Sequence, residues 1–354
     1  MPKVSVIILN WNQPEFTVNC VKSVLKQSYQ DFEILLVDNG SEDNSLEIFK
    51  REFGKNEKIR ILETGKNLGY AGGNNFGVEH AKGEYIVILN NDTIAEEKWL
   101  EELVNGVKSD PNIGAVSSRE IRVGENLPEI DWKTEGITRT LVWYPVRFRR
   151  KEPLENADIA PLLPIKGCSF IYKKGLLELP FDSEYFIYAE DDYLAWLLNL
   201  KGYQNKIATK SVVRHFHNIV RKSSKKINEY FIFLGERNRI MNMLIFYELS
   251  TLIRIIPLVL MNMLLLNMIE IRKSPYRIKA YLWLLINPFK ILEKRKHIQK
   301  QRKISDNQLL VELSCKIRDE TVFEDSTKRR ILVFINRLSC VYSRIVGLKA
   351  VETS

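Results

Sequence analysis

The sequence has few cysteines and no long apolar segment at its start. Only four of its 354 residues are cysteines, namely Cys20, Cys168, Cys315 and Cys340. No two of them have the Cys-x-x-Cys spacing of a metal or redox site, so we expect reduced thiols in a cytosolic protein. The first apolar run, residues 4–9, is too short for the apolar core of a signal peptide, which favours residence on the cytosolic side.

Common phosphate-binding motifs are missing as well. Residues 67–77 hold four glycines between a predicted strand and a predicted helix, but they match neither Gly-x-Gly-x-x-Gly nor a loop ending in Gly-Lys-Ser/Thr. ATPase and dinucleotide-binding functions therefore lose support. Because glycine has no side chain, we expect this segment to let the backbone approach a ligand closely. The sequence has no zinc-finger spacing, and we expect no nucleic acid partner.

Charge divides the chain into two parts. Residues 1–200 carry 23 Lys and Arg against 32 Asp and Glu, a net charge of −9. Residues 201–354 carry 30 against 12, a net charge of +18. We therefore predict a catalytic domain at residues 1–225 and a helical, basic region at residues 226–354.

Apolar runs alternate with helical periodicity in the first part. Strands are predicted at residues 4–9, 32–37, 59–62, 85–89, 114–117 and 166–172, and a further strand is predicted just before His215. Helices are predicted between the early strands, and loops or a hairpin over the site are expected from residues 119–163. This alternation predicts an α/β fold, with a mixed, mostly parallel sheet flanked by helices.

Carboxylates follow two of these strands. Asp92 comes after the run 85–89, and Asp38 ends the run 32–37. Because open α/β sheets bind ligands beyond the carboxyl ends of their strands, Asp92 is a candidate ligand of a divalent cation and Asp38 a candidate partner of a base or ribose. Both residues equally suit the capping of the turn that follows, and the two interpretations stay open.

Further candidates lie near the end of the catalytic half. Glu190, Asp191 and Asp192 open a helix predicted at residues 193–200. A carboxylate at a helix start in a cleft is a candidate general base, and helix capping is the alternative. His215, just after a strand, either completes a metal site through a ring nitrogen or has a structural role.

Together these motifs resemble the inverting glycosyltransferases of family 2 with the GT-A fold, in particular the rhamnosyltransferase-like members. The resemblance runs from Val4 to about Ser224. The matching stretches are Val-Ser-Val-Ile-Ile-Leu-Asn-Trp-Asn at 4–12, Val-Asp-Asn-Gly-Ser at 37–41, Asn-Leu-Gly-Tyr-Ala-Gly-Gly-Asn-Asn at 67–75, Leu-Asn-Asn-Asp-Thr at 89–93, Phe-Asp-Ser-Glu-Tyr-Phe-Ile-Tyr-Ala-Glu-Asp at 181–191 and Lys-Gly-Tyr at 201–203.

The resemblance implies a hexosyltransferase, with rhamnose as one expected sugar, that moves the sugar with inversion from a nucleotide-diphospho-sugar to a glycan or lipid-linked acceptor. It implies that Asp38 binds the base, Asp92 and His215 bind Mg²⁺ or Mn²⁺, and Asp191 is the general base. The substrate-binding residues that it implies are Asn12, Asp38, Asn67, Gly69, Gly72, Gly167 and Glu190. The competing hypotheses are a sugar nucleotidyltransferase, for which residues 10–13 offer no phosphate-binding element, and a non-enzymatic protein that binds nucleic acid or membrane through its basic half.

The sequence departs from the family pattern at three places. Tyr193 and Leu197 occupy positions where the family often has Asp and Arg, which predicts an unusual acceptor or weak activity. The metal element is Asn-Asn-Asp rather than two aspartates, which predicts modest cation affinity. A Gln-x-x-Arg-Trp element is absent, which argues against a processive polysaccharide synthase.

The basic region is predicted to be helical over residues 228–346. Its most apolar run, residues 255–269, falls short of the roughly 20 apolar residues of a membrane-spanning helix. Flanking cations with interleaved Tyr and Trp suit anionic headgroups. We therefore expect peripheral attachment to the inner face of the cell membrane, with a dimerisation module as the alternative.

Overall fold

The computed structural model describes residues 2–124, 129–217, 225–322 and 325–351. The strands are β1 (Val4–Asn10), β2 (Phe32–Asp38), β3 (Ile59–Glu63), β4 (Tyr85–Asn90), β5 (Thr93–Ala95), β6 (Ile113–Arg122), β7 (Glu135–Arg139), β8 (Pro145–Arg149), β9 (Ile159–Pro161), β10 (Ser169–Lys173) and β11 (Gln204–His215). The helices are α1 (Pro14–Leu25), α2 (Ser45–Phe53), α3 (Gly69–His80), α4 (Trp99–Lys108), α5 (Glu190–Leu200), α7 (Lys225–Phe246), α8 (Leu249–Ile269), α9 (Ser274–Ile286), α10 (Pro288–Lys300), α11 (Asp306–Leu310) and α12 (Ser326–Ile345). Short 3₁₀ turns lie at Ser183–Tyr185, Ile271–Lys273 and Glu320–Val322.

The main sheet is mixed and mostly parallel, as the sequence predicts. Its strands follow the order β3-β2-β1-β4-β10-β6-β11-β5, with β9 paired to β11. The first four strands are parallel to one another, whereas β10 runs antiparallel between β4 and β6. Since β6 and β11 are again parallel to each other, the carboxyl ends of β4, β6 and β11 supply residues to one region of the sheet edge.

Successive side chains of each strand pack alternately into two separate hydrophobic cores. Val4, Val6 and Ile8 pack with α1, α2 and α4 on one face of the sheet. Ile7 packs with α3 and α5 on the other face, together with Leu35 and Ile88 of the adjacent strands. This follows from the two-residue period of a strand. The apolar run of β1 therefore lacks polar alternation because both of its faces are covered.

Glycine allows α3 to pack close to the sheet. A Cβ atom added at Gly73 would lie 2.5 Å from Leu9 Cδ1, and Gly69, with φ of +73°, begins the helix against Phe186. Residues 69–80 thus form a helix that contacts β1 and β2. Close helix-to-sheet packing is accordingly a structural reason for these glycines.

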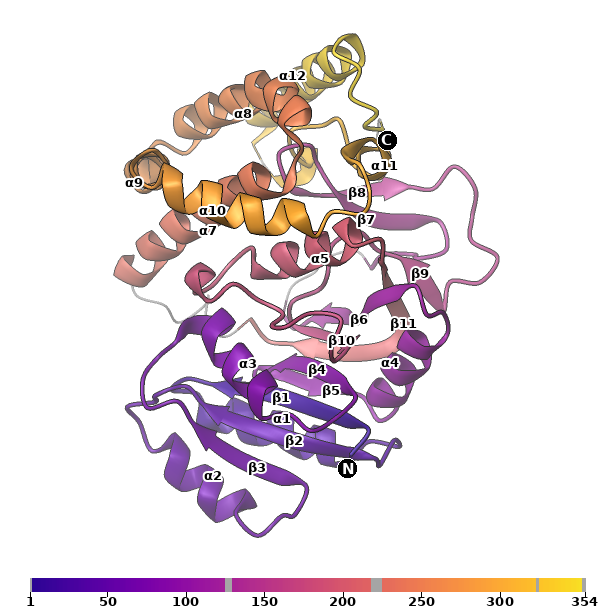
Figure 1. Ribbon diagram of the computed structural model, residues 1–354, viewed down its shortest axis with the longest axis vertical. Helices are drawn as coiled ribbons and strands as arrows, with labels where there is room; N and C mark the ends of the chain where they lie inside the picture. Colours follow the sequence, from indigo (N-terminus) through magenta and orange to yellow (C-terminus); the bar gives the residue numbers. More distant parts are fainter. Residues whose placement is uncertain (1, 125–128, 218–224, 323–324, 352–354) are drawn as a thin grey trace.

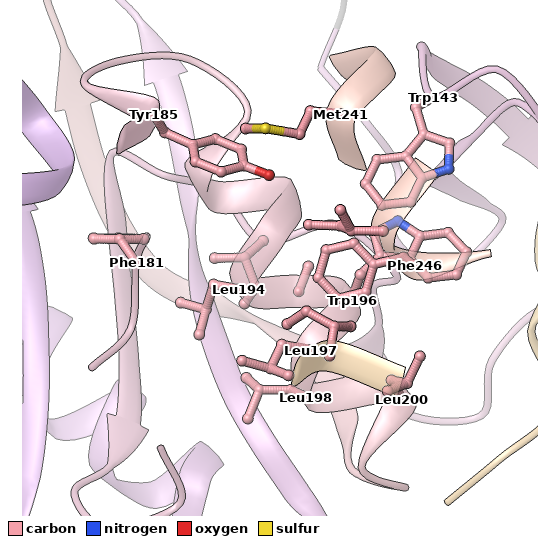
Figure 2. Close-up of a cluster of buried hydrophobic side chains, with 14 of the residues drawn as sticks. Trp143, Phe181, Tyr185, Leu194, Trp196, Leu197, Leu198, Leu200, Met241 and Phe246 are labelled. Atoms are coloured by element: carbon pink, nitrogen blue, oxygen red, sulfur yellow. The ribbon is translucent and has the colours of Figure 1, made fainter. Parts of the chain in front are cut away.

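The C-terminal helices continue the second core. They gather at the end of the molecule opposite to β1, β2 and β3 (Figure 1). Trp143 stacks on Trp196 of α5 with ring centroids 4.5 Å apart, and Phe246 and Tyr247 at the end of α7 contact both indoles. Figure 2 shows Trp143, Trp196 and Phe246 side by side in this cluster. The predicted boundary after residue 225 directly follows residues 218–224, which lie outside the described residues.

Residues 119–163, where the sequence predicts loops or a hairpin, contain the β7–β8 hairpin and the short strand β9. The helix α2 begins at Ser45 after Asn44, and the Ser41 hydroxyl accepts N–H groups of Asn10 and Asn12.

The expectation of four reduced cysteines is wrong for one pair. Cys315 and Cys340 form a disulfide across a Cα separation of 4.8 Å, whereas Cys20 and Cys168 are free and buried. The fold brings α12 beside the segment that holds Cys315. A sequence separation of 25 residues does not reveal such proximity.

The expectation that the apolar C-terminal run is too short to span a membrane is also wrong. It is part of α8, a helix of 21 residues, which is long and apolar enough to cross a membrane by length and composition alone. Pro257 and two asparagines interrupt the apolar sequence, but the helix continues through them. In the described part of the chain, α8 is the single helix that meets this criterion.

We expect Trp196→Ala to lower the free energy of unfolding by about 3–5 kcal/mol, because it leaves a cavity where both halves of the chain meet. Denaturant titration monitored by fluorescence would measure it. Trp11→Ala is the matched control, since Trp11 is 37% exposed and its loss should cost less than about 0.5 kcal/mol. Equal losses in the two variants would contradict a joint core.

Candidate functional site

A buried polar cluster lies where β4, β6 and β11 end. Asp92 follows β4, Glu120 belongs to β6, and His215 is the last residue of β11. His215 pairs with Thr93 of β5 on one side and with Arg122 of β6 on the other. The strand pairing therefore brings these three side chains together from distant parts of the sequence.

His215 connects the two carboxylates. Its Nε2 lies 3.1 Å from Asp92 Oδ1, and its Nδ1 lies 2.6 Å from Glu120 Oε1. His217 Nε2 lies 3.0 Å from the same Glu120 oxygen, and the Lys166 ammonium lies 3.8 Å from Glu120 Oε2. All of these side chains except Lys166 and His217 are nearly inaccessible to solvent.

The charges in this cluster stabilise one another. Burial by itself lowers the pKa of His215, but its contacts with Asp92, Cys168 and Glu120 raise this pKa to about 12. Burial likewise raises the pKa of Glu120, yet hydrogen bonds with His215 and His217 outweigh it and hold this pKa well below its ordinary value. These contacts favour the charged form of each side chain.

Glu120 and His217 were missed by the sequence analysis. Glu120 lies on the strand that was predicted only as far as residue 117, and the signal was available, since a carboxylate beyond a parallel strand meets the same sheet edge as Asp92. His217 follows His215 by two residues, which places both side chains on one side of an extended chain.

The donor atoms suit a hard divalent cation. Ligand atoms of Glu120, His215 and His217 lie within 4.8 Å of one another, and Asp92 adds a carboxylate on the other side of His215. Carboxylate oxygens with imidazole nitrogens fit Mn²⁺, and the carboxylates fit Mg²⁺. The set that could hold a metal therefore includes the predicted His215, whereas Asp92 contacts the opposite nitrogen of its ring.

Asp191 lies beside the backbone of Gly167. A Cβ atom added at Gly167 would lie 3.3 Å from Asp191 Oδ2, so a larger residue would press on the carboxylate. The Tyr70 hydroxyl donates a hydrogen bond of 2.7 Å to the Gly167 carbonyl. Burial raises the pKa of Tyr70, and the charges of Glu190, Asp191 and Asp92 raise it further. Tyr70 is therefore within electrostatic reach of both candidate carboxylate groups.

The two neighbours of Asp191 are buried. Burial and the charge of Asp191 raise the pKa of Glu190 well above its ordinary value, and Glu190 Oε2 has no hydrogen-bond partner among the described residues. Burial raises the pKa of Asp192 to about 6, although the Arg139 guanidinium, 2.6 Å away, opposes this shift. Asp192 therefore anchors the start of α5 to β7, and Glu190 offers a free oxygen.

Asp38 is buried and already holds a turn. Its Oδ1 accepts the Asn10 side-chain amide at 3.1 Å, and its Oδ2 accepts the Ser41 N–H at 3.1 Å. The backbone of Asn12 has φ of +55°, and its side-chain oxygen accepts the Glu42 N–H at 2.8 Å. The turn-capping interpretation thus accounts for one hydrogen bond to each oxygen of Asp38, and further lone pairs remain.

The remaining predicted substrate-binding residues lie near the start of α3. Asn67 Oδ1 accepts the Gly69 N–H at 2.8 Å and an amide hydrogen of Asn39 at 3.2 Å. A Cβ atom added at Gly72 would come within 2.9 Å of Leu68. These contacts order the entry to α3, which lies between β3 and β4 in the sequence.

Comparison with known proteins gives consistent results. A family model described as glycosyl transferase family 2 matches residues 5–171. Glycosyltransferase GlyG of Streptococcus pneumoniae serotype 4 is 40% identical over 105 residues, which are 30% of this chain and 35% of that protein. An uncharacterized glycosyltransferase of Haemophilus influenzae is 26% identical over 248 residues, covering 64% of this chain and 73% of that protein. The chain thus spans about a third of the length of the first of these relatives.

Solved structures share the fold. The crystal structure of GalNAc-T7 with UDP, GalNAc and Mn²⁺ has a TM-score of 0.56 at 16% identity and covers 70% of this chain and 49% of its own. The structure of S. aureus TarS 1–349 has a TM-score of 0.51 at 15% identity and covers 97% of this chain and 90% of its own. Residues 5–171 of this chain thus match glycosyl transferase family 2, and its mixed sheet is of the GT-A type.

Proposed function

We propose that the protein is a metal-assisted, inverting glycosyltransferase that moves a sugar from a nucleotide-diphospho-sugar to a hydroxyl of a glycan or lipid-linked acceptor. The observation that carries this proposal is the meeting of Asp92, Glu120 and His215 at one sheet edge, together with Asp191 beside Gly167, whose carbonyl accepts a hydrogen bond from Tyr70. A cation-binding group and a separate base are the two groups that such a transfer needs.

The donor would bind along the carboxyl ends of β1, β2 and β4. In this proposal Asp38 and Asn12 contact the nucleoside, while Asn67, Gly69 and Gly72 line the entry to α3. Gly167 and Glu190 would face the sugar, and the free Oε2 of Glu190 is available to accept a sugar hydroxyl. The location of ligand sites in open α/β sheets supports this arrangement.

Asp191 would accept the proton of the acceptor hydroxyl as it attacks the anomeric carbon. One direct displacement inverts the anomeric configuration and needs only one carboxylate as base. Asp92, His215 and Glu120 would hold Mg²⁺ or Mn²⁺, which supplies positive charge to the leaving diphosphate when bound. The Mn²⁺ in the GalNAc-T7 structure agrees with this choice of metal.

The acceptor side would lie at a membrane surface. Large apolar side chains of α8 are exposed along one stripe, consisting of Ile253, Ile256, Leu260, Leu264 and Met268. A second exposed stripe runs along α12, consisting of Ile331, Phe334, Leu338, Val341 and Ile345. Exposed cations such as Arg337 and Arg344 accompany the α12 stripe, a combination typical of helices that lie in the interface of an anionic membrane.

We expect Asp92→Ala to reduce metal-dependent turnover of the donor at least about tenfold, because loss of a metal ligand or its support costs about 10–100-fold in affinity. A panel of UDP-, GDP- and dTDP-sugars with Mn²⁺, Mg²⁺ or EDTA would measure the released nucleotide and identify the sugar. Asp158→Asn, on an exposed surface aspartate, is the control. Turnover that is unaffected by EDTA and by Asp92→Ala would refute the metal site.

Asp191→Asn should lower kcat by about 10²–10⁴-fold, the usual contribution of a general base. Donor affinity, measured by calorimetry, should stay within about twofold, because the base acts on the acceptor. Asparagine keeps the shape next to Gly167, so a folding defect is not expected. Unchanged kcat in this variant would exclude Asp191 as the base.

We expect the full chain to float with vesicles that contain anionic lipid and to bind less as salt increases. Phe334→Glu with Ile345→Glu should weaken binding by at least about tenfold, because each places a charge on the apolar stripe. Lys55→Ala with Lys58→Ala produces the same change in net charge near β3, at the opposite end of the molecule, and should leave vesicle binding largely unchanged. Recovery of the full chain in the soluble fraction without vesicle binding would contradict membrane attachment.

A further inference from the structure

The loop before Asp191 has an unfavourable backbone. Phe186, Tyr188 and Ala189 have φ of +60°, +72° and +64°, in the left-handed region that residues with a side chain rarely adopt. Ala189 is the cap of α5, and Asp191 follows it by two residues. Such a conformation persists only where surrounding contacts hold it. The position of Asp191 therefore depends on what holds this loop.

Side chains of α7 provide these contacts. The two N–H groups of the Asn238 amide are shared among the carbonyls of Tyr185 at 3.0 Å, Ile187 at 3.1 Å and Tyr188 at 2.8 Å from the nitrogen. Asn238 is fully buried. Because these three carbonyls point at one nitrogen, the amide fixes the path of the loop through its residues with positive φ.

Two neighbours of Asn238 extend the contact. The Asn242 amide donates to the Ala189 carbonyl at 3.0 Å, and the Arg237 guanidinium donates to the Glu184 carbonyl at 2.8 Å. Arg237 Nε also donates to Asn238 Oδ1 at 2.9 Å, which fixes the orientation of the amide. The loop from Glu184 to Ala189 is thus bound along its length by one helix.

The same helix holds the hairpin on the other side of Asp191. Arg239 donates to the Val142 carbonyl at 2.7 Å and pairs with Glu236 at 2.7 Å. That hairpin carries Arg139, which binds Asp192. The first turn of α5 is therefore held on one side by the loop before it and on the other by the hairpin, and residues 236–242 contact both.

We propose that residues 236–242 of α7 position the catalytic base, with Asn238 as the positioning residue for the loop that precedes Asp191. This inference rests on the proposed role of Asp191. It gives the C-terminal region a function in the reaction itself, in addition to the proposed membrane contact. Asparagine suits the position because its amide donates to carbonyls while its oxygen accepts from Arg237, whereas aspartate has no donor for the carbonyls.

The test compares Asn238→Ala and Asn238→Asp with Asn336→Ala in the full chain. Asn336 is a matched control, because it is also buried and bonds to the backbone, at Ile317 and Arg318 rather than at residues 184–192. We expect both Asn238 variants to lower kcat at least about tenfold with donor KM within about twofold, since misplacement of a reacting group lowers kcat. Asn336→Ala should lower thermal stability similarly and leave kcat within about twofold.

Hydrogen exchange of residues 184–192 gives a second measurement that does not require activity. We expect faster exchange of this loop in both Asn238 variants and no change in Asn336→Ala. Equal effects of Asn238→Ala and Asn336→Ala on kcat and on loop exchange would overturn the inference. If neither Asn238 variant folds, Asn242→Ala, which removes the contacts to the Ala189 carbonyl and the Tyr185 hydroxyl, is held to the same two criteria. A wild-type protein without donor turnover would instead refute the proposed function, and the exchange measurement would still decide whether α7 holds the loop.

Discussion

The structure depends on the packing of α7 between the sheet domain and the other C-terminal helices. Phe246 and Tyr247 at its end enter the aromatic cluster with Trp143 and Trp196, and Asn238 in its middle binds the loop before α5. Burial of large aromatic rings supplies the main free energy of this contact, and the hydrogen bonds give it direction. Because α5 carries Asp191, the same packing joins the C-terminal region to the proposed chemistry.

The polar cluster at the sheet edge depends on a different constraint. Asp92, Glu120 and His215 are charged groups held away from water, and each is stabilised because the others neutralise it. A cluster of this kind costs free energy when one member is removed, since a buried charge is left without its partner. The cluster lies at the strand ends, which is where open α/β sheets bind their ligands.

The C-terminal region combines two properties that would conflict in a simple soluble domain. One side of its helices packs on the catalytic half and holds the loop before Asp191, whereas the other side exposes apolar stripes beside cations. A membrane surface would cover the exposed stripes without disturbing the packed side. In that arrangement the basic residues of the C-terminal region would face anionic lipid, and the acidic residues of the catalytic half would face the metal.

The sequence by itself determined the strands with two covered faces and their alternation with helices. It also placed Asp92, Asp38, Asp191 and His215 at the ends of elements. Both results follow because hydrophobic periodicity and strand ends are local properties of the chain. Only the tertiary structure decided the rest. The β7–β8 hairpin, Glu120 and the disulfide between Cys315 and Cys340 depend on pairing between residues far apart in the chain. The role of α7 could not be found from the sequence either, because an asparagine on a helix gives no sign of which carbonyls it will meet.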